Sequence, residues 1–167
     1  MVGGETVRCD NPSLLVREPP EWPRQPLRLV ATRQREFPNR QAYQIFTDGY
    51  PTELVHIQAR EQWAEWLVSL GQREICALLV EGGGRLAGEL LAAGCVDKLT
   101  FFVAPRLLIA DDARAVVAAA NFPLNKPEDG PALHDMHVQQ TGNDIEITGY
   151  LHDVHRYCRD NGTAGQP

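Results

Sequence analysis

Short apolar runs separated by turn residues predict the strands in the first part of the chain. The first run covers residues 27–32. The second covers 42–47 and is closed by Asp48-Gly49, a pair typical of turns. A shorter run follows at 53–57. We therefore expect a strand at each of these places.

The residues after these runs have the spacing of a helix. Apolar side chains recur every three or four positions within 60–70, at Trp63, Trp66, Leu67 and Leu70. This spacing predicts an amphipathic helix that ends at Gly71, with both tryptophans packed in the core. The proline-rich stretch at 18–26 can be neither regular helix nor strand, so we expect a surface loop there.

An acid and three glycines separate an apolar run from an amphipathic run near the middle of the chain. The apolar run at 75–80 predicts a buried strand, and 85–93 predicts a helix. A further strand is expected at 98–103, paired in parallel with the first across the helix. The turn at 81–84 would let a phosphate meet backbone N–H groups at the start of the helix. It has neither the Gly-x-Gly-x-x-Gly spacing nor a Gly-Lys-Ser/Thr ending, so a packing turn and a nucleotide site both stay open.

The last part of the chain predicts one antiparallel pair of strands. These are 137–141 and 145–151, joined by the turn residues Gly142-Asn143-Asp144. Residues 106–133 are expected to be irregular, with a possible short helix at 113–120. The polar residues 158–167 are expected to form a flexible tail, which leaves 1–157 as the folded domain.

Composition and charge narrow the classes of protein. A chain of 167 residues that is 43% apolar is expected to form one domain with a packed core. The net charge of −6 and the lack of a basic stripe argue against nucleic acid as a partner. No apolar run approaches the roughly 20 residues of a membrane span, and no signal peptide opens the chain. We expect a cytoplasmic protein without membrane contact, in which Cys76 and Cys95 are buried thiols.

Two short histidine pairs invite a metal interpretation. They are His134 with His137 and His152 with His155. Both pairs lie beside predicted strands, where side chains three positions apart point to opposite faces. No Cys-x-x-Cys pair accompanies them. We expect no metal site.

Two longer blocks of sequence carry a family resemblance. The first, VGGETVRCDNPSLLVR, covers 2–17, and the second runs from LLVEGGGRLAG at 78–88 to FFVAPRLL at 101–108. In this order and at this separation, they resemble the C-terminal reductase domain of the riboflavin-biosynthesis deaminase/reductase family. The resemblance implies a dihydrofolate-reductase-like α/β fold, with a mixed, mostly parallel sheet flanked by helices. It also implies NADPH as cofactor and a homodimer, because family members usually dimerise through this domain.

The resemblance assigns substrate-binding residues one by one. Leu14, Arg17 and Glu81 match positions that contact the substrate. A guanidinium such as that of Arg17 suits a sugar phosphate, although the side chain alone also fits a solvated strand end. Glu81 is the candidate catalytic residue, able to help a proton reach the ring oxygen as the sugar opens. Its other interpretation is a charge that favours the dipole of the following helix.

The cofactor-binding positions fall in three places. Thr6 and Asp10 match one pair of contacts. Thr32 and Arg33, at a predicted strand end, match more loosely a site for the 2′-phosphate of NADPH. The turn and first helical residues match the cofactor-phosphate site, at Gly83, Gly84, Arg85, Leu86, Ala87, Gly88 and Glu89. Arg85 adds a phosphate contact in this interpretation, or is simply exposed.

The start of the chain departs from the family. Relatives carry a first, central strand and a helix before the block that begins here, and we expect the domain to be truncated at its N-terminus. Such a loss would leave 27–31 and 75–80 as open apolar edges. The first hypothesis is an NADPH-dependent reductase that converts the ribosyl group of 5-amino-6-(5-phosphoribosylamino)uracil to ribityl. The alternatives are another dihydrofolate-reductase-like pterin or pyrimidine reductase, and a truncated, inactive nucleotide-binding domain.

Overall fold

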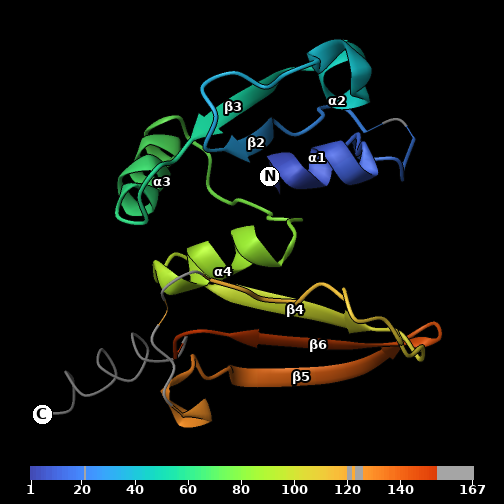
Figure 1. Ribbon diagram of the computed structural model, residues 1–167, viewed down its shortest axis with the longest axis vertical. Helices are drawn as coiled ribbons and strands as arrows, with labels where there is room; N and C mark the ends of the chain where they lie inside the picture. Colours follow the sequence, from blue (N-terminus) through green and yellow to red (C-terminus); the bar gives the residue numbers. More distant parts are fainter. Residues whose placement is uncertain (21, 120–121, 123–125, 154–167) are drawn as a thin grey trace, which may run out of the picture. The chain divides into compact units, whose positions relative to one another are not determined.

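The chain forms two compact units, which are described separately. The computed structural model describes residues 1–20, 22–119, 122 and 126–153 (Figure 1). The first unit comprises Met1–Cys95 and Arg114–Phe122, and the second comprises Val96–Ala113 and the residues from 123 onward. The tail expected at 158–167 lies outside the described residues.

A parallel sheet forms the centre of the first unit. Its strands, in spatial order, are β1 (Val2–Gly3), β2 (Arg28–Thr32) and β3 (Thr52–His56). β2 pairs with β3 along its whole length, and with β1 at Val30 and Ala31. The strands predicted at 27–32 and 53–57 are confirmed. The open edge expected at 27–31 is wrong, because β2 has a neighbour on each side.

Helix α1 (Gly4–Asp10) packs against β1 and β2 and helps to enclose the main apolar core. This core consists of buried side chains from the helix, the strands and the loops between them: Val2, Val7, Val30, Phe37 and Ile45. The ring of Phe37 meets Tyr43 edge-on at 5.5 Å between centroids and Phe46 at 5.2 Å. Offset and edge-on aromatic pairs of this kind add stability beyond the area they bury.

The strand predicted at 42–47 is wrong. These residues form a 3-10 turn, η1 (Arg40–Ala42), and a single helical turn, α2 (Gln44–Thr47). The Asn11 side-chain oxygen accepts the Gln44 N–H at 2.8 Å and so satisfies a donor at the start of α2. Ile45 is buried in the core from this helical turn. The hydrogen bond from Asn11, which is distant in the sequence, thus favours a helical turn where the apolar run alone indicates a strand.

Two longer helices confirm the periodic patterns. α3 (Gln62–Gln72) buries Trp63 and Leu70, and the rings of Trp63 and Trp66 meet edge-on at 5.7 Å. It runs one residue past Gly71, where it was expected to end. α4 (Gly84–Ala92) buries Leu86 and Leu90, and Gly94 beyond its end takes the left-handed conformation, with φ of 65°.

The strand predicted at 75–80 is absent. Among the described residues, Met1 alone offers strand-like pairing, through its terminal ammonium to Leu79 O at 2.6 Å and through its carbonyl to the Glu81 N–H at 2.9 Å. The Ile75 N–H instead turns back to Leu70 O at the end of α3, at 3.1 Å. A strand needs a neighbour along its length, and a single residue provides none. Leu79 is therefore 71% exposed, and Cys76, expected to be buried, is exposed.

An antiparallel sheet forms the second unit. Its strands are β4 (Lys98–Val103), β6 (Asp144–Tyr150) and β5 (His134–Thr141), in that spatial order. β5 and β6 form the predicted hairpin, with Gly142 at φ of 63° in the turn. The strand predicted at 98–103 is confirmed, but its partner is wrong. β4 pairs antiparallel with β6, so the expected parallel crossover does not form.

The connection between the units has little regular structure. The possible short helix at 113–120 does not form over 113–119, and residue 120 lies outside the described part of the chain. A 3-10 turn, η2 (Pro127–Asp129), precedes β5. Among the residues placed by the structure, no helix is long and apolar enough to cross a membrane.

Candidate active site

A pocket of about 470 Å³ opens in the first unit between α1 and the glycine turn that precedes α4. Its lining combines two carboxylates, a hydroxyl, a thiol, a guanidinium and bare backbone: Asp10, Glu81, Thr6, Cys9, Arg114, Gly82 and Gly83. The pocket thus brings together residues far apart in the sequence that were assigned to one site. They are Thr6, Asp10, Glu81 and Gly83.

Hydrogen bonds hold the two walls of this pocket together. The Gly83 N–H donates to Thr6 Oγ1 at 3.3 Å, which joins the turn to α1. The Glu81 N–H donates to the Met1 carbonyl at 2.9 Å, which joins the same turn to the residue before β1. A Cβ placed on Gly82 would lie 2.9 Å from Leu86 Cδ2, so the turn has little room for a side chain there. The backbone of residues 81–83 is therefore fixed against α1.

The start of α4 borders the pocket and provides backbone donors. Gly83 is the residue before the helix, and no side chain caps it. The N–H groups of Leu86 and Ala87 turn back to the Gly83 carbonyl at 3.0 and 3.3 Å. Those of Gly84 and Arg85 have no partner within the helix, as is usual in a first helical turn. No acidic side chain lies in that first turn, and Glu81 is the acidic residue that precedes it.

Gly84 and Gly88 allow close packing of another segment on α4. The segment 114–119 lies across them, and Ala118 N–H donates to the Gly84 carbonyl at 2.9 Å. A Cβ on Gly84 would lie 2.2 Å from the Ala115 carbonyl oxygen. A Cβ on Gly88 would lie 2.3 Å from the corresponding oxygen of Ala118. The missing side chains of Gly84 and Gly88 therefore have a packing role, which leaves the backbone N–H of Gly84 free of any role in this contact.

Arg114 is a pocket residue that the sequence did not reveal. Its Nη2 donates to Cys9 Sγ at 3.5 Å, so the guanidinium reaches from the loop after β4 to the last turn of α1. This hydrogen bond is the main cause that raises the pKa of Arg114 above its ordinary value. Arg114 lies in the segment where only a possible helix was expected, and no spacing or motif marked it.

Thr32 and Arg33 lie at the end of β2, outside the lining of this pocket. Thr32 Oγ1 accepts the Gln34 N–H at 3.1 Å. The Arg33 side chain is 74% exposed and lies 3.9 Å from the Glu89 carboxylate, which is also 3.5 Å from Arg60 Nε. Glu89, assigned to the cofactor-phosphate turn, thus contacts two guanidinium groups. Arg60 was not anticipated.

Leu14 and Arg17 follow α1 and do not line the pocket. Leu14 has a φ of 56°, an uncommon value for a residue with a side chain, and packs against the main core. Arg17 is exposed. Leu14 therefore has a packing role, and Arg17 is not among the residues that line the pocket with Glu81.

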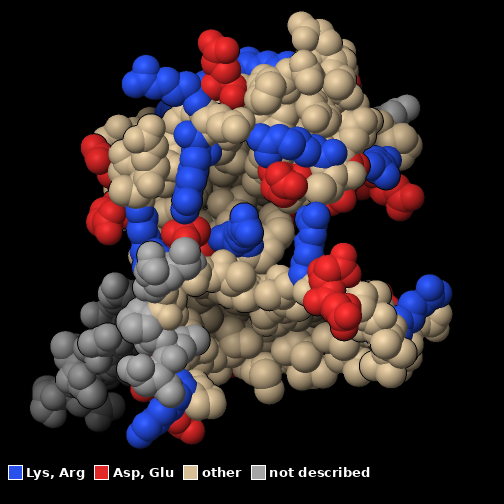
Figure 2. All heavy atoms as spheres, viewed as in Figure 1, with Lys and Arg blue, Asp and Glu red and all other residues tan. Residues whose placement is uncertain are grey.

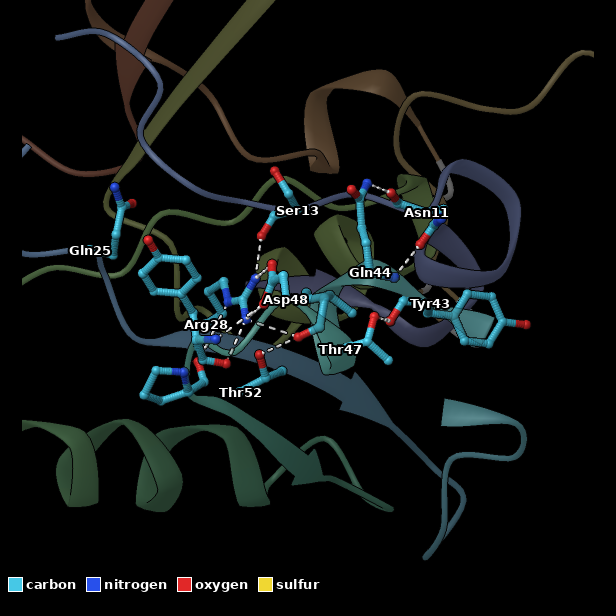
Figure 3. A network of polar contacts seen from close by, with 12 residues as sticks. Asn11, Ser13, Gln25, Arg28, Tyr43, Gln44, Thr47, Asp48 and Thr52 are labelled. Carbon is cyan, nitrogen blue, oxygen red and sulfur yellow. Dashed lines mark hydrogen bonds and ion pairs between the residues drawn. The ribbon is translucent and has the colours of Figure 1, made fainter. Parts of the chain in front are cut away.

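A buried arginine fixes the loop that carries these two residues (Figure 3). The side chain of Arg28 is 1% exposed, and its guanidinium forms a paired ion contact with Asp48 at 2.6 and 2.7 Å. It also donates to backbone carbonyls within α2, after α2 and in the loop after α1, those of Ile45, Tyr50, Pro51 and Ser13. Hydrogen bonds from Arg28 hold the pKa of Asp48 below its ordinary value. Sequence analysis placed Arg28 in a strand but gave it no role.

Outside the pocket, positive and negative side chains occur side by side on the surface. On the face shown in Figure 2, Lys and Arg side chains are interspersed with Asp and Glu. Among the described residues, no group of three or more His, Cys, Asp and Glu side chains is arranged to hold a metal ion. His155, one of the histidines considered for a metal, lies outside the described part of the chain.

Comparison with known proteins places this chain in a family. Residues 1–147 match the model of the RibD C-terminal domain. The riboflavin biosynthesis protein RibD of Haemophilus influenzae is 32% identical over 171 residues, which cover 86% of this chain and 45% of that protein. The Synechocystis protein of the same name is 31% identical and is matched over 90% of this chain and 45% of its own length.

A solved structure agrees with the sequence relatives. A crystal form of RibD from Acinetobacter baumannii superposes with a TM-score of 0.65 at 26% identity, over 89% of this chain and 45% of that one. The chain belongs to the RibD C-terminal domain family. Its fold is α/β and dihydrofolate-reductase-like, as the resemblance implied. The chain spans about half the length of the curated relatives it matches.

Proposed function

We propose that this domain is the NADPH-dependent reductase of riboflavin biosynthesis, which converts the ribosyl group of 5-amino-6-(5-phosphoribosylamino)uracil to ribityl. The observation that carries the proposal is the pocket that gathers Thr6, Asp10, Glu81 and Gly83 in a member of the RibD C-terminal domain family. Bound NADPH would supply the hydride for the sugar carbon C1′. The rest of the chemistry falls to residues of the chain.

The donors around the pocket fit an anionic dinucleotide. The Gly84 and Arg85 N–H groups at the start of α4 can receive a phosphate, helped by the helix dipole. The Thr6 hydroxyl can add a donor from α1, and the Asp10 carboxylate can accept from ribose hydroxyl groups. The pocket thus offers donors for phosphate and an acceptor for sugar in one place.

We propose that Glu81 acts on the substrate. Its carboxylate lines the pocket from the turn before α4, whose backbone is fixed by the Gly83–Thr6 and Glu81–Met1 hydrogen bonds. A carboxyl group there can hold the N–H groups of the pyrimidine. It can also carry a proton to the sugar ring oxygen, which leaves C1′ open to reduction. Holding and protonating the substrate are the two roles that we assign to it.

Oxidation of NADPH by the purified protein tests the function directly. We expect the absorbance of NADPH to fall when 5-amino-6-(5-phosphoribosylamino)uracil is added, and the ribityl product to appear. Turnover of a pterin with no reaction of this pyrimidine would favour the other reductase. NADPH binding without turnover of either compound would favour a nucleotide-binding role.

Replacing Glu81 with glutamine keeps the shape of the side chain and removes its charge and proton. We expect turnover to fall roughly tenfold or more, the effect of losing about 1.4 kcal/mol of transition-state stabilisation. The affinity for NADPH should stay near that of the unchanged protein. Steady-state kinetics and a separate NADPH titration give both values. Unchanged turnover would mean that Glu81 serves only the entry of α4.

Thr32 and Arg33 are proposed to bind the 2′-phosphate that distinguishes NADPH from NADH. The support is their place at the end of β2, with one hydroxyl and one exposed guanidinium side by side. Changing Arg33 to alanine should weaken NADPH binding by about 1 kcal/mol, the upper end of the range for an exposed ion pair, because the side chain is largely in solvent. NADH binding should not change. Calorimetric titration with both cofactors would refute the assignment if both affinities fell equally.

We further propose that the protein is a homodimer. The support is a set of exposed apolar side chains in the second unit, with Phe102 63% exposed on β4 and Leu107, Leu108 and Ile109 almost fully exposed after it. Exposed apolar surface of this kind marks contact sites in soluble proteins. Sedimentation of the purified protein should give twice the mass of the chain, and a monomer at all concentrations would refute the proposal.

A further inference from the structure

The segment 114–119 is anchored on α4 in a way that fixes the position of Arg114. The Ala118 N–H bonds the Gly84 carbonyl at 2.9 Å, and the missing side chains of Gly84 and Gly88 let the carbonyls of Ala115 and Ala118 lie directly on the helix. Arg114 is the residue next to the first of these contacts. Its backbone is therefore held at the start of α4, beside the pocket.

The guanidinium of Arg114 spans the pocket and is not neutralised there. Its Nη2 reaches Cys9 Sγ on α1 at 3.5 Å, and a thiol is a weak acceptor. Within the described parts of the chain, no carboxylate lies close enough to Arg114 to form an ion pair, although Glu5 and Asp10 lie within its field. Most of its N–H donors thus remain available to a ligand.

The charge balance of the pocket makes this guanidinium necessary for an anion. The other charged side chains of the lining are the carboxylates of Asp10 and Glu81. The chain as a whole carries a net charge of −6. An anion that enters such a pocket needs a local cation to offset this repulsion. Arg114 is the cation that the described lining provides.

We propose that Arg114 binds the diphosphate of the dinucleotide cofactor, together with the backbone N–H groups at the start of α4. This inference rests on the proposed function. The cofactor is favoured over the substrate's phosphate because Arg114 lies with Thr6, Asp10 and Gly83, the pocket residues assigned to the cofactor. A planar guanidinium can form two parallel hydrogen bonds to phosphate oxygens, which backbone N–H groups alone do not provide.

The test measures ligand binding by titration calorimetry with R114Q, which removes the charge from an exposed side chain. We expect R114Q to bind NADPH and ADP about 10- to 100-fold more weakly, the range for losing a charged hydrogen bond. Binding of ribose 5-phosphate, which carries the substrate's phosphate group, should not change. R114K keeps the charge but not the paired geometry, and its affinities should be intermediate. R73Q makes the same change of charge at the end of α3 and should bind all three ligands normally.

The outcomes separate this inference from the proposed function. If the unchanged protein binds NADPH and R114Q binds it equally well, Arg114 has no such role while the function stands. If R114Q loses ribose 5-phosphate binding and keeps that of ADP, the residue serves the substrate and the cofactor assignment is overturned. If the unchanged protein binds ADP but not NADPH, the function fails, and weaker ADP binding by R114Q still supports the inference. If it binds neither nucleotide, both are overturned.

Discussion

Replacing Arg28 with methionine is expected to lower the free energy of unfolding by about 3–5 kcal/mol, the range for breaking a buried ion pair from one side. The variant leaves the Asp48 carboxylate half-buried without its partner. It also leaves the carbonyl oxygens of Ser13, Ile45 and Tyr50 without the hydrogen bonds that Arg28 donates to them. A small domain is stable by only about 5–15 kcal/mol, so this single change can unfold much of the protein.

Urea unfolding measures this effect, and the chain offers a matched control. Arg73 also forms a paired contact with a carboxylate, that of Glu53 at 2.7 and 2.9 Å. Both of those side chains are nearly half exposed, at 46% and 45%. Arg73→Met should therefore cost much less stability than Arg28→Met, because surface pairs contribute little. Equal losses in the two variants would show that Arg28 does not organise the loops around it.

The same ion pair makes stability depend on pH in the acid range. The pKa of Asp48 is lower in the folded protein than in the unfolded chain, because Arg28 donates hydrogen bonds to the ionised form. Its contribution is therefore complete above the unfolded pKa of about 3.9 and is lost as the pH falls through the lower folded value. Asp48→Asn should flatten this part of the stability curve, and an unchanged curve would contradict the assignment.

Two glycine-to-alanine changes within helices are expected to have opposite signs. In Gly88→Ala, the new Cβ would lie 2.3 and 2.4 Å from the carbonyl oxygen and carbon of Ala118. These are backbone atoms, so the segment 114–119 must move. We expect a loss of about 2–3 kcal/mol, in the upper part of the range for overpacking. In Gly71→Ala on α3, nothing lies within 4 Å of the new Cβ, and the helix should gain about 0.5–1 kcal/mol.

Thermal unfolding of the two variants shows whether each change raises or lowers the stability of the protein. NADPH titration of Gly88→Ala adds a second measurement, because displacing 114–119 also moves Arg114 away from the pocket. Weaker NADPH binding together with lower stability is the expected result. A stabilised Gly88→Ala would mean that the segment does not lie on α4 in solution.

Sequence patterns predicted the elements that are stabilised by their own residues. α3 and α4 follow from apolar spacing, and the β5–β6 hairpin follows from alternation around a turn. Residues 42–47 and 75–80 were predicted wrongly because their structure depends on distant partners. Asn11 caps the helical turn at Gln44, and only Met1 is present to pair with the second segment in the described chain. An apolar run carries no information about either partner.

Only the pocket residues that lie in a recognisable sequence motif could be predicted from the sequence. Thr6, Asp10, Glu81 and Gly83 came from the two blocks that resemble the family, and the structure brings them to one pocket. Whether they bind a cofactor or substrate stays a prediction. Arg114 was not found because it lies in a loop without periodicity, and its place depends on Gly84 and Gly88 far away in the sequence. Arg28 has the appearance of an ordinary strand residue, since its acceptors are mostly backbone carbonyls, which any sequence provides.

The segment before Glu81 has a consequence for how the pocket responds to ligands. Between Cys76 and Val80, the backbone N–H groups form no backbone hydrogen bonds to other described residues. Local opening of such a segment requires little free energy, so we expect its amide hydrogens to exchange readily with water, although its sequence is apolar. Glu81 therefore lies between a segment with few backbone hydrogen bonds, residues 76–80, and a turn that is hydrogen-bonded to Thr6. A ligand that binds the Glu81 carboxylate is therefore expected to slow hydrogen exchange at the five amides that precede it, those of residues 76–80.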